Sequence, residues 1–337
     1  MRQLTLTEQR TLEWWDVPEP KLESERDALV KPVAVAACDL DARIISGEAP
    51  IPAPVALGHE LVAEVVDAGD QAGASPGNVV VVPFQISCGD CARCKAGQTG
   101  MCESVPRRSM YGFGALGGLN WGGALSDLVR VPFADHMLVP LPPGVDPVAV
   151  ASVSDNLPDA WRTVAPVIKE GDSVLVAGGG GISIALYAVA VAKALGASHV
   201  AYLDDDPDRL ALAAELRAEP IEGVPSEPIG PYEITVDASA DPQKLATALR
   251  STAPCGTCTS IGIYWGNDVP LPLLEMYDRA VTFITGSPQA RPAIPEVLEL
   301  VASGKLQPER ITTRVVRFDD AAEALGEPYT KLVMTPS

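Results

Sequence analysis

Four cysteines crowd into one short segment, CGDCARCKAGQTGMC, where their side chains could bind a metal ion. The spacing is C-x2-C-x2-C-x7-C, and the segment holds four of the seven cysteines of the chain: Cys88, Cys91, Cys94 and Cys102. Four thiolates on one compact loop can complete a tetrahedron around Zn²⁺, which neutralises their charge and fixes the loop. Disulfides and an iron–sulfur centre are the alternatives, but clustered cysteines in a reducing compartment favour metal over disulfides. We therefore predict a structural zinc site with no open coordination position.

A histidine followed by an acid, His59 in LGHELVAEV, is the second candidate for metal chemistry. It stands at the head of an apolar, strand-like run and is one of only three histidines in the chain. A single histidine of this kind is more often structural than a ligand. His59 therefore needs companion ligands before it predicts a metal site.

A glycine-rich turn in VLVAGGGGIS lies between a strand-like and a helix-like segment, as a dinucleotide-binding turn requires. Gly178 would allow the tight turn and Gly180 would let the backbone approach a pyrophosphate, while the helix N-terminus would supply a positive dipole. Gly181 and Ile182 complete the turn and are further candidate contacts. Ser183 takes the place of the third glycine, and its small side chain should cost little. Such a turn is weak evidence when it stands alone.

Asp204 ends the next strand-like segment in HVAYLDDDPDRL, 26 residues after Gly178. A carboxylate there can accept hydrogen bonds from both ribose hydroxyls of NAD. With Asp205 and Asp206 beside it, it would repel the 2′-phosphate of NADP. The alternative is a solvated acidic turn that caps the next helix, which explains Asp206 but leaves Asp204 at the strand end to chance. We therefore predict NAD as the cofactor, with Arg209 as a further candidate contact.

Two patterns of elements would position these residues. Up to about position 150, short β segments are broken by Gly and Pro, for example VVVVPF (79–84) and LVRVPF (128–133). After about position 155, apolar strands alternate with Ala-rich helical segments, which is typical of βαβ units in a parallel sheet. We predict a buried helix from Ile182 to Leu195, with Gly196 closing its C-terminus. The remaining predicted elements are the strands EITVDAS (233–239), TCTSIGI (257–263) and VTFITGS (281–287), the helix PEVLELVASGKL and the short strand KLVM.

A length of 337 residues suits two domains. We predict an α/β protein with a mostly-β, irregular zinc-binding domain at 1–153 and 289–337. A Rossmann-type, doubly wound parallel-sheet domain for NAD would occupy 154–288. The formal net charge of -19 argues against nucleic acid or an anionic membrane as a partner. Because the sequence shows neither a signal-peptide pattern nor an apolar run of membrane-spanning length, we expect a cytoplasmic protein.

The cysteine loop, the GHE that precedes it and the dinucleotide-binding half that follows resemble the medium-chain zinc alcohol dehydrogenase family over essentially the whole chain. The resemblance implies a GroES-like fold for the catalytic domain and a second, catalytic zinc. The family's ligands are a cysteine, the histidine of GHE and a third acid or cysteine, and the matching residues are Cys38, His59 and Asp155. Asp155 has an alternative role as a helix N-cap, because Pro158 marks a helix start just beyond it. Glu60 matches a residue that can replace the zinc-bound water in similar enzymes.

The implied activity is reversible hydride transfer between a primary or secondary alcohol and NAD, which gives an aldehyde or a ketone. Three protein ligands leave one position on Zn²⁺ for the alcohol oxygen, where the metal acts as a Lewis acid. In similar enzymes VDAS (236–239) and SIGI (260–263) line the cofactor, so Ser239 and Ile263 are candidate contacts. Phe84 and Trp121 would wall the alcohol pocket or, with equal weight, belong to the core. We expect two zinc ions per chain, a small-molecule alcohol or aldehyde as substrate, and a homodimer or homotetramer.

Three positions depart from the family's pattern. A hydroxyl residue two places after the zinc cysteine and a histidine three places further usually carry the alcohol proton, but Leu40 and Arg43 stand there. Arg43 stays protonated at any working pH and suits the pyrophosphate of the cofactor instead. Asp159 stands where Thr is often found near the nicotinamide. The alternatives are therefore an aldehyde or ketone reductase or a polyol dehydrogenase of the same family, or a zinc- and NAD-binding protein that has lost catalysis. A zinc-free quinone reductase fits less well, because that branch generally lacks both ligand sets.

Overall fold

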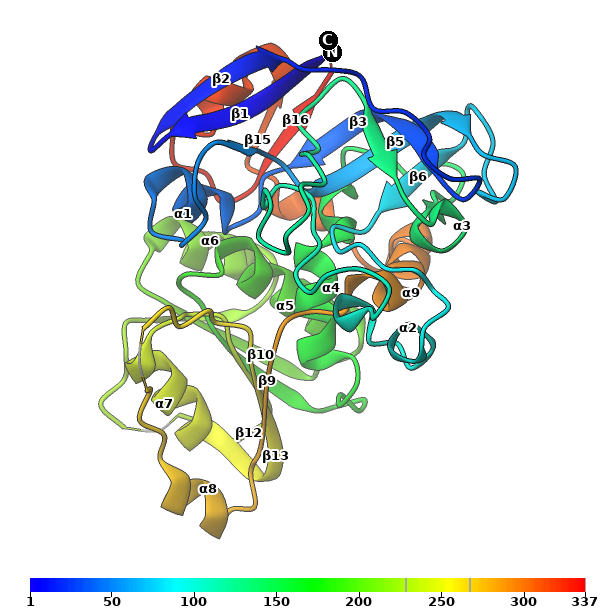
Figure 1. Cartoon of the computed structure of the whole chain (residues 1–337). Coiled ribbons are helices and arrows are strands. Elements are labelled where there is room, and N and C mark those ends of the chain that lie inside the picture. Colours follow the sequence, from blue (N-terminus) through cyan, green and yellow to red (C-terminus); the bar gives the residue numbers. More distant parts are fainter. Residues whose placement is uncertain (228, 267, 337) are drawn as a thin grey trace. The chain divides into compact units, whose positions relative to one another are not determined.

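The computed structural model describes residues 1–227, 229–266 and 268–336. The chain forms two compact units, whose elements are labelled in Figure 1. The first unit consists of Met1–Pro158 and Pro288–Ser337, and the second of Asp159–Ser287. Asp155 therefore lies in the first unit, together with the segments that carry Cys38 and His59.

The first unit is built on two β-sheets. Its strands are β1 (Arg2–Glu8), β2 (Thr11–Asp16), β3 (Ala28–Ala36), β4 (Val55–Ala56), β5 (Glu60–Ala68), β6 (Val79–Val82), β7 (Val129–Val131), β8 (Val139–Pro140), β15 (Arg314–Arg317) and β16 (Leu332–Thr335). A three-stranded sheet has the order β2-β1-β4, and a seven-stranded sheet has the order β15-β16-β3-β5-β6-β8 with β7 paired to β3. In the antiparallel pair of β3 and β5, Ala36 lies opposite Glu60. The residues just after β3 and just before β5 are thereby neighbours.

Helices and a large apolar core complete the first unit. The helices are α1 (Asp41–Ser46), α2 (Ala92–Lys95), α3 (Ala134–Met137), α9 (Ala290–Ala302) and α10 (Ala321–Ala324). Leu61, Ala63 and Val65 alternate along β5 toward the core, and the other face of the strand is buried at Val62 and exposed at Glu64. The predicted C-terminal helix begins at Ala290 rather than near Pro295, so this proline lies inside α9 instead of at its start.

The second unit is a six-stranded parallel sheet with helices. Its strands are β9 (Ser173–Ala177), β10 (His199–Asp204), β11 (Glu219–Glu222), β12 (Tyr232–Asp237), β13 (Thr252–Ser260) and β14 (Thr282–Thr285). Its helices are α5 (Ile182–Ala194), α6 (Pro207–Glu215), α7 (Pro242–Ser251) and α8 (Leu273–Asp278), while α4 (Asn156–Val164) begins in the first unit and ends in this one. The order β11-β10-β9-β12-β13-β14 is that of a dinucleotide-binding fold. This sheet confirms the predicted α/β class.

The helix α5 follows the glycine turn and is apolar nearly all round. Its residues from Ser183 to Val189 are all buried, which explains why the sequence shows no polar stripe there. The chain leaves the helix through Gly196, whose φ of +90° favours glycine. None of the helices in the described part of the chain is long and apolar enough to cross a membrane.

Candidate functional site

The four-cysteine loop brings its sulfur atoms together. The Sγ atoms of Cys88, Cys91, Cys94 and Cys102 all lie within 4.8 Å of one another, as ligands of one metal ion would. Backbone N–H groups point at these sulfurs: Asp90 and Cys91 each donate to the Sγ of Cys88 at 3.4 Å. The backbone N–H groups of Glu103 and Cys94 lower the pKa of Cys91 to about 6. The loop therefore favours thiolate at this position, which is the form that binds zinc.

Arg26 holds the cysteine loop in place from the segment before β3. Its guanidinium contacts Asp90 at 2.7 Å, forms a two-pronged pair with Asp135 at 2.7 and 2.8 Å, and donates to the carbonyl oxygen of Cys88 at 3.0 Å. Planar guanidinium groups suit such multiple contacts, which fix geometry as well as charge. The cysteine motif in the sequence does not predict that Arg26 contacts the loop.

A second cluster joins three buried residues from three segments of the first unit. Cys38 follows β3, His59 precedes β5, and Asp155 lies at the start of α4, with their ligand atoms within 4.8 Å of one another. Asp155 Oδ2 lies 3.3 Å from Cys38 Sγ and 3.2 Å from His59 Nε2. One sulfur, one nitrogen and one oxygen are a donor set that could hold a zinc ion and leave one coordination position open. The structure thus brings together the three residues that the family resemblance implied.

Asp41 faces the other nitrogen of the His59 ring. His59 Nδ1 and Asp41 Oδ1 are 3.6 Å apart, and neither atom has a hydrogen-bond partner among the described residues. The second oxygen of Asp41 accepts a hydrogen bond from the backbone N–H of Cys38 at 2.9 Å. A metal on Nε2 would place the proton on Nδ1, directed at Asp41, so these two orphaned atoms fit a metal-bound histidine. Burial lowers the pKa of His59, but Asp41 and Asp155 outweigh it and raise the pKa to about 9.

Glu60 is held by its own ion pair. Both side chains of the Glu60–Lys331 pair are fully buried, with Lys331 Nζ 2.6 Å from Glu60 Oε2. The other oxygen of Glu60 accepts from the backbone N–H of Asn156 at 3.0 Å, and Lys331 also donates to the carbonyl oxygen of Ala37 at 2.7 Å. Burial raises the pKa of Glu60, and Lys331 acts in the opposite direction. Glu60 is not among the ligand atoms gathered by Cys38, His59 and Asp155, so its part as an occasional ligand remains a prediction.

Aromatic rings cover the His59 side of the cluster. The ring of Phe113 lies 4.9 Å and that of Phe84 5.7 Å from the His59 ring, centroid to centroid. Gly112 leaves no room for a side chain, because a Cβ there would stand 2.8 Å from the carbonyl oxygen of Gly58. The sequence marks Phe84 as either a pocket wall or a core residue, and it gives no sign of Phe113. The ring of Trp121, in contrast, lies under the guanidinium of Arg130 at 5.8 Å, and no contact places it beside His59.

The glycine turn of the second unit is closely packed. A Cβ at Gly178 would lie 2.5 Å from Asp204 Oδ2, and one at Gly181 would lie 2.9 Å from a methyl group of Ile261. The backbone N–H of Gly180 donates to the carbonyl oxygen of Ser239 at 2.8 Å, and that of Gly181 to Ala238 at 2.8 Å. The turn therefore tolerates only glycine at Gly178 and Gly181, and it leads directly into α5 at Ile182.

Asp204 is fully buried and already receives hydrogen bonds from its own chain. Its Oδ1 accepts from Arg209 at 2.7 Å and from the backbone of Asp205 at 2.7 Å, and its Oδ2 accepts from Tyr202 at 2.6 Å and from Arg209 at 2.9 Å. Burial would raise the pKa of Asp204, but these hydrogen bonds lower it. Lys244, which lies 2.6 Å from Asp205 and donates to Gly178 at 3.1 Å, brings a second cation to this end of the sheet. The predicted ribose acceptor is thus also an anchor for Arg209.

The other predicted cofactor residues occupy different surroundings. The hydroxyl of Ser239 donates to Asp237 at 2.5 Å, while Ile263 is 47% exposed. Asp159 pairs with Arg162 at 2.5 Å. Arg43 lies in the last turn of α1 in the first unit and is half-buried.

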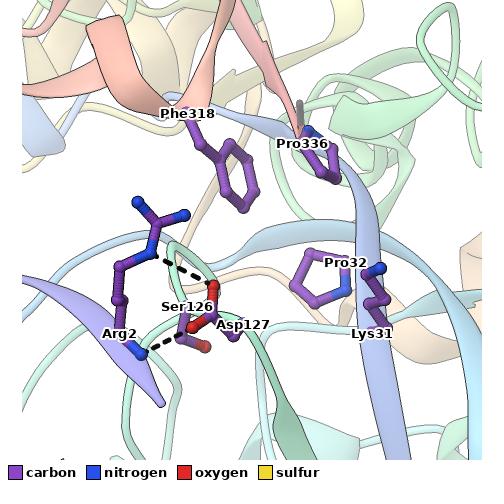
Figure 2. Close-up of a pocket in the computed structure, with 7 residues that line it drawn as sticks. All are labelled: Arg2, Lys31, Pro32, Ser126, Asp127, Phe318 and Pro336. Atoms are coloured by element: carbon purple, nitrogen blue, oxygen red, sulfur yellow. Dashed lines mark hydrogen bonds and ion pairs between the residues drawn. The ribbon is translucent and has the colours of Figure 1, made fainter. Parts of the chain in front are cut away.

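A small surface pocket in the first unit takes no part in either cluster. Figure 2 shows its lining, in which the backbone and guanidinium of Arg2 both contact Asp127. The lining residues are Arg2, Lys31, Pro32, Ser126, Asp127, Phe318 and Pro336. Because none of them is a metal-ligand candidate, we assign this pocket no chemistry.

Comparison with known proteins shows the family of the chain. Residues 24–143 match the alcohol dehydrogenase GroES-like domain. A probable zinc-binding alcohol dehydrogenase of Mycobacterium tuberculosis is 32% identical over 315 residues, 91% of this chain and 79% of that protein. A glutathione-independent formaldehyde dehydrogenase of Bacillus subtilis is 27% identical over 347 residues, 90% of this chain and 84% of that protein. Among solved structures, an alcohol dehydrogenase from Thermus sp. ATN1 matches with a TM-score of 0.92 and 30% identity over the full length of both chains.

These likenesses extend beyond a shared fold, because the identity to the mycobacterial protein spans most of both chains. They confirm the family predicted from the cysteine loop, the GHE motif and the glycine turn. The chain belongs to the medium-chain zinc alcohol dehydrogenase family, and it is an oxidoreductase.

Proposed function

We propose that the protein is a zinc- and NAD-dependent alcohol dehydrogenase that carries two zinc ions per chain and interconverts an alcohol with its aldehyde or ketone. The observation that carries the proposal is the cluster of Cys38, His59 and Asp155, with Asp41 facing the His59 ring. When bound, zinc supplies a Lewis acid for the alcohol oxygen and NAD supplies the hydride acceptor. The four-cysteine loop would hold the second, structural zinc.

The residues around the cluster orient and shield the site. Asp41 would hold the proton of His59 Nδ1 and so present Nε2 to the metal. The Lys331 ammonium would keep the Glu60 carboxylate in place beside the ligands. Phe84 and Phe113 would cover His59 with apolar surface, which excludes water and favours the carbon-rich part of an alcohol.

The acidic end of β10 supports NAD rather than NADP. Four carboxylates follow one another closely at Asp204, Asp205, Asp206 and Asp208. Arg209 is already engaged by Asp204, so a 2′-phosphate would meet an excess of negative charge. The glycine turn and the start of α5 would receive the pyrophosphate.

The compartment and the assembly are further parts of the proposal. All seven cysteines are free in the structure, which suits a reducing cytoplasm. Among the described strands, β14 pairs only with β13. Helix α8 exposes Leu273, Leu274 and Tyr277 by 65%, 73% and 82%. An edge strand and exposed apolar side chains in this unit support a homo-oligomer.

A panel of primary and secondary alcohols, aldehydes and ketones, assayed with NAD, NADH and their phosphorylated forms, tests the activity. Elemental analysis of protein expressed with ample zinc should find about two zinc ions per chain. His59→Ala should abolish turnover, because it removes a ligand of the catalytic zinc. It should leave NADH binding intact, because His59 lies in the first unit and the glycine turn lies in the second. The matched control is His199→Ala, a half-buried histidine of the second unit that lies outside both clusters and pairs with Glu219, and this variant should keep full activity. Activity that survives in His59→Ala would overturn the assignment of the catalytic site.

A further inference from the structure

Asn156 touches two of the groups that surround the proposed catalytic zinc. It follows Asp155 at the start of α4 and is completely buried. Its side-chain Oδ1 accepts a hydrogen bond from the Cys38 thiol at 3.1 Å. Its backbone N–H donates to Glu60 Oε1 at 3.0 Å. The side-chain contact and the backbone contact are independent, so a substitution can remove the first and keep the second.

A cysteine that binds a metal is a thiolate and has no proton to donate. The amide group of an asparagine carries an acceptor on one side and two donors on the other, and a half-turn about the last torsion exchanges them. Beside a thiolate, only the N–H side makes a favourable contact. In the structure, Asn156 Oδ1 accepts a hydrogen bond from the Cys38 thiol at 3.1 Å. Once a metal takes the place of that proton, a half-turn of the amide would present an N–H to the sulfur instead.

The sulfurs of the cysteine loop provide an internal comparison. Cys91 receives backbone N–H groups from Cys94 and Glu103 at 3.4 Å each. Cys38 receives one backbone N–H, from Leu40 at 3.4 Å, and its shorter contact is the one to the side-chain amide of Asn156. A side chain rather than the backbone thus completes the surroundings of the catalytic thiolate.

We propose that Asn156 is a positioning residue of the catalytic zinc site, whose side-chain amide donates to the Cys38 thiolate and sets how strongly the sulfur donates to the metal. This inference rests on the proposed function, because it requires a metal on Cys38. A donor on a ligating sulfur withdraws charge from it and holds its direction, and loss of such an outer partner weakens metal sites. The amide would also tie Cys38 to the segment that carries Asp155.

The test replaces the more labile zinc with Co²⁺, which reports the sulfur directly through a sulfur-to-metal charge-transfer band. In Asn156→Leu, which has a similar size and no N–H donor, the band should move to longer wavelength because the electrons of the sulfur rise in energy. The affinity of the site for Zn²⁺ should fall about 10- to 100-fold. Glu60 keeps its backbone contact in this variant, so the change reports the side chain alone. Asn156→Ala serves as a second variant should leucine prevent folding.

The matched control is Ser104→Ala, which removes a hydroxyl 3.1 Å from the sulfur of Cys88 in the other cluster. This control should leave the catalytic charge-transfer band where it is. If the parent protein takes up Co²⁺ and shows the band, but the Asn156 variants show the same band and the same zinc affinity, the inference alone is wrong. If the parent takes up no metal beyond the cysteine loop, the proposed catalytic zinc fails and the inference falls with it.

Discussion

Binding of zinc at Cys38, His59 and Asp155 should release about two protons near neutral pH. In the metal-free protein, the carboxylates of Asp41 and Asp155 raise the pKa of His59 to about 9 against the effect of burial. Burial and the same carboxylate neighbourhood raise the pKa of the Cys38 thiol well above its ordinary value. Both groups therefore hold a proton at pH 7, and both must lose it to become ligands.

The size of the pH dependence of zinc affinity follows from the number of protons released. Below the pKa of His59, each proton released raises the zinc affinity about tenfold per pH unit, which is about 1.4 kcal/mol. Two protons give about 100-fold per pH unit, so the affinity should rise by about four orders of magnitude between about pH 6 and pH 8. The zinc affinity should fall as the pH falls, because at low pH the protons return to the ligands and displace the metal. Above about pH 9 the slope should decrease, since His59 is then neutral before zinc binds.

Zinc titrations of protein stripped of its labile metal measure this directly. Calorimetry in two buffers of different ionisation enthalpy gives the number of protons released, and chelator competition at several pH values gives the slope. Asp41→Asn is the control, because it removes a carboxylate that raises the pKa of His59 and should lower the proton count at pH 8. If the zinc affinity of the parent protein changed with pH as for the release of fewer than one proton, the assignment of Cys38 and His59 as a buried ligand pair would be refuted.

Three further perturbations test separate parts of the structure. Arg26→Met should lower the free energy of unfolding by about 1 to 3 kcal/mol, because it removes the contacts to Asp135 and to the cysteine loop. It should also speed the loss of zinc from that loop. Thermal unfolding measures the first effect and metal analysis the second. Asp204→Ala should weaken NADH binding by about 1 to 3 kcal/mol, which fluorescence titration measures, and equal use of NAD and NADP by the parent would contradict the reasoning. Leu40→Ser alone should change turnover by less than about tenfold, because the relay would still lack a terminal base, and a gain should require Arg43→His as well; turnover against pH for the single and double variants decides this.

The ligand residues could be predicted because each lies in a short, recognisable motif. The cysteine loop is local in sequence, so its spacing alone restricts the possible geometries. His59 stands at the head of an apolar run that becomes β5, and the pairing of Ala36 with Glu60 brings it beside the segment of Cys38. Asp41 lies three residues after Cys38 and could have been found from the need of a ligating histidine for a second partner.

Other parts of the site depend on long-range pairing that no motif reveals. Lys331 reaches Glu60 because β16 pairs with β3, with Val333 opposite Ala36. Nothing near Lys331 in the sequence distinguishes it from a solvated lysine. The ring of Trp121 lies against Arg130 for a similar reason, since both positions depend on how loops pack rather than on local pattern.

The surroundings of Asp204 were within reach of the sequence and were missed. Residues two apart on a strand point to the same face, so Tyr202 was bound to lie beside Asp204. Arg209 lies five residues further, in the first turn and a half of α6, where its guanidinium can return to the strand end. A carboxylate with a tyrosine and an arginine at these spacings accepts hydrogen bonds from its own chain, in addition to any that it would accept from a ribose.

Charge balance explains how so many ionisable groups can share one buried place. Asp41, Glu60 and Asp155 are each at most 6% exposed, and an isolated buried charge is costly. Lys331 offsets Glu60, and the two positive charges of a bound zinc ion would offset the Cys38 thiolate and Asp155. Asp41 would then accept a hydrogen bond from the Nδ1 proton of His59. In the metal-free protein the protonated His59 ring offsets part of the charge of Asp41 and Asp155. A bound zinc ion would take over this role, so it would contribute to the stability of this unit as well as to its chemistry.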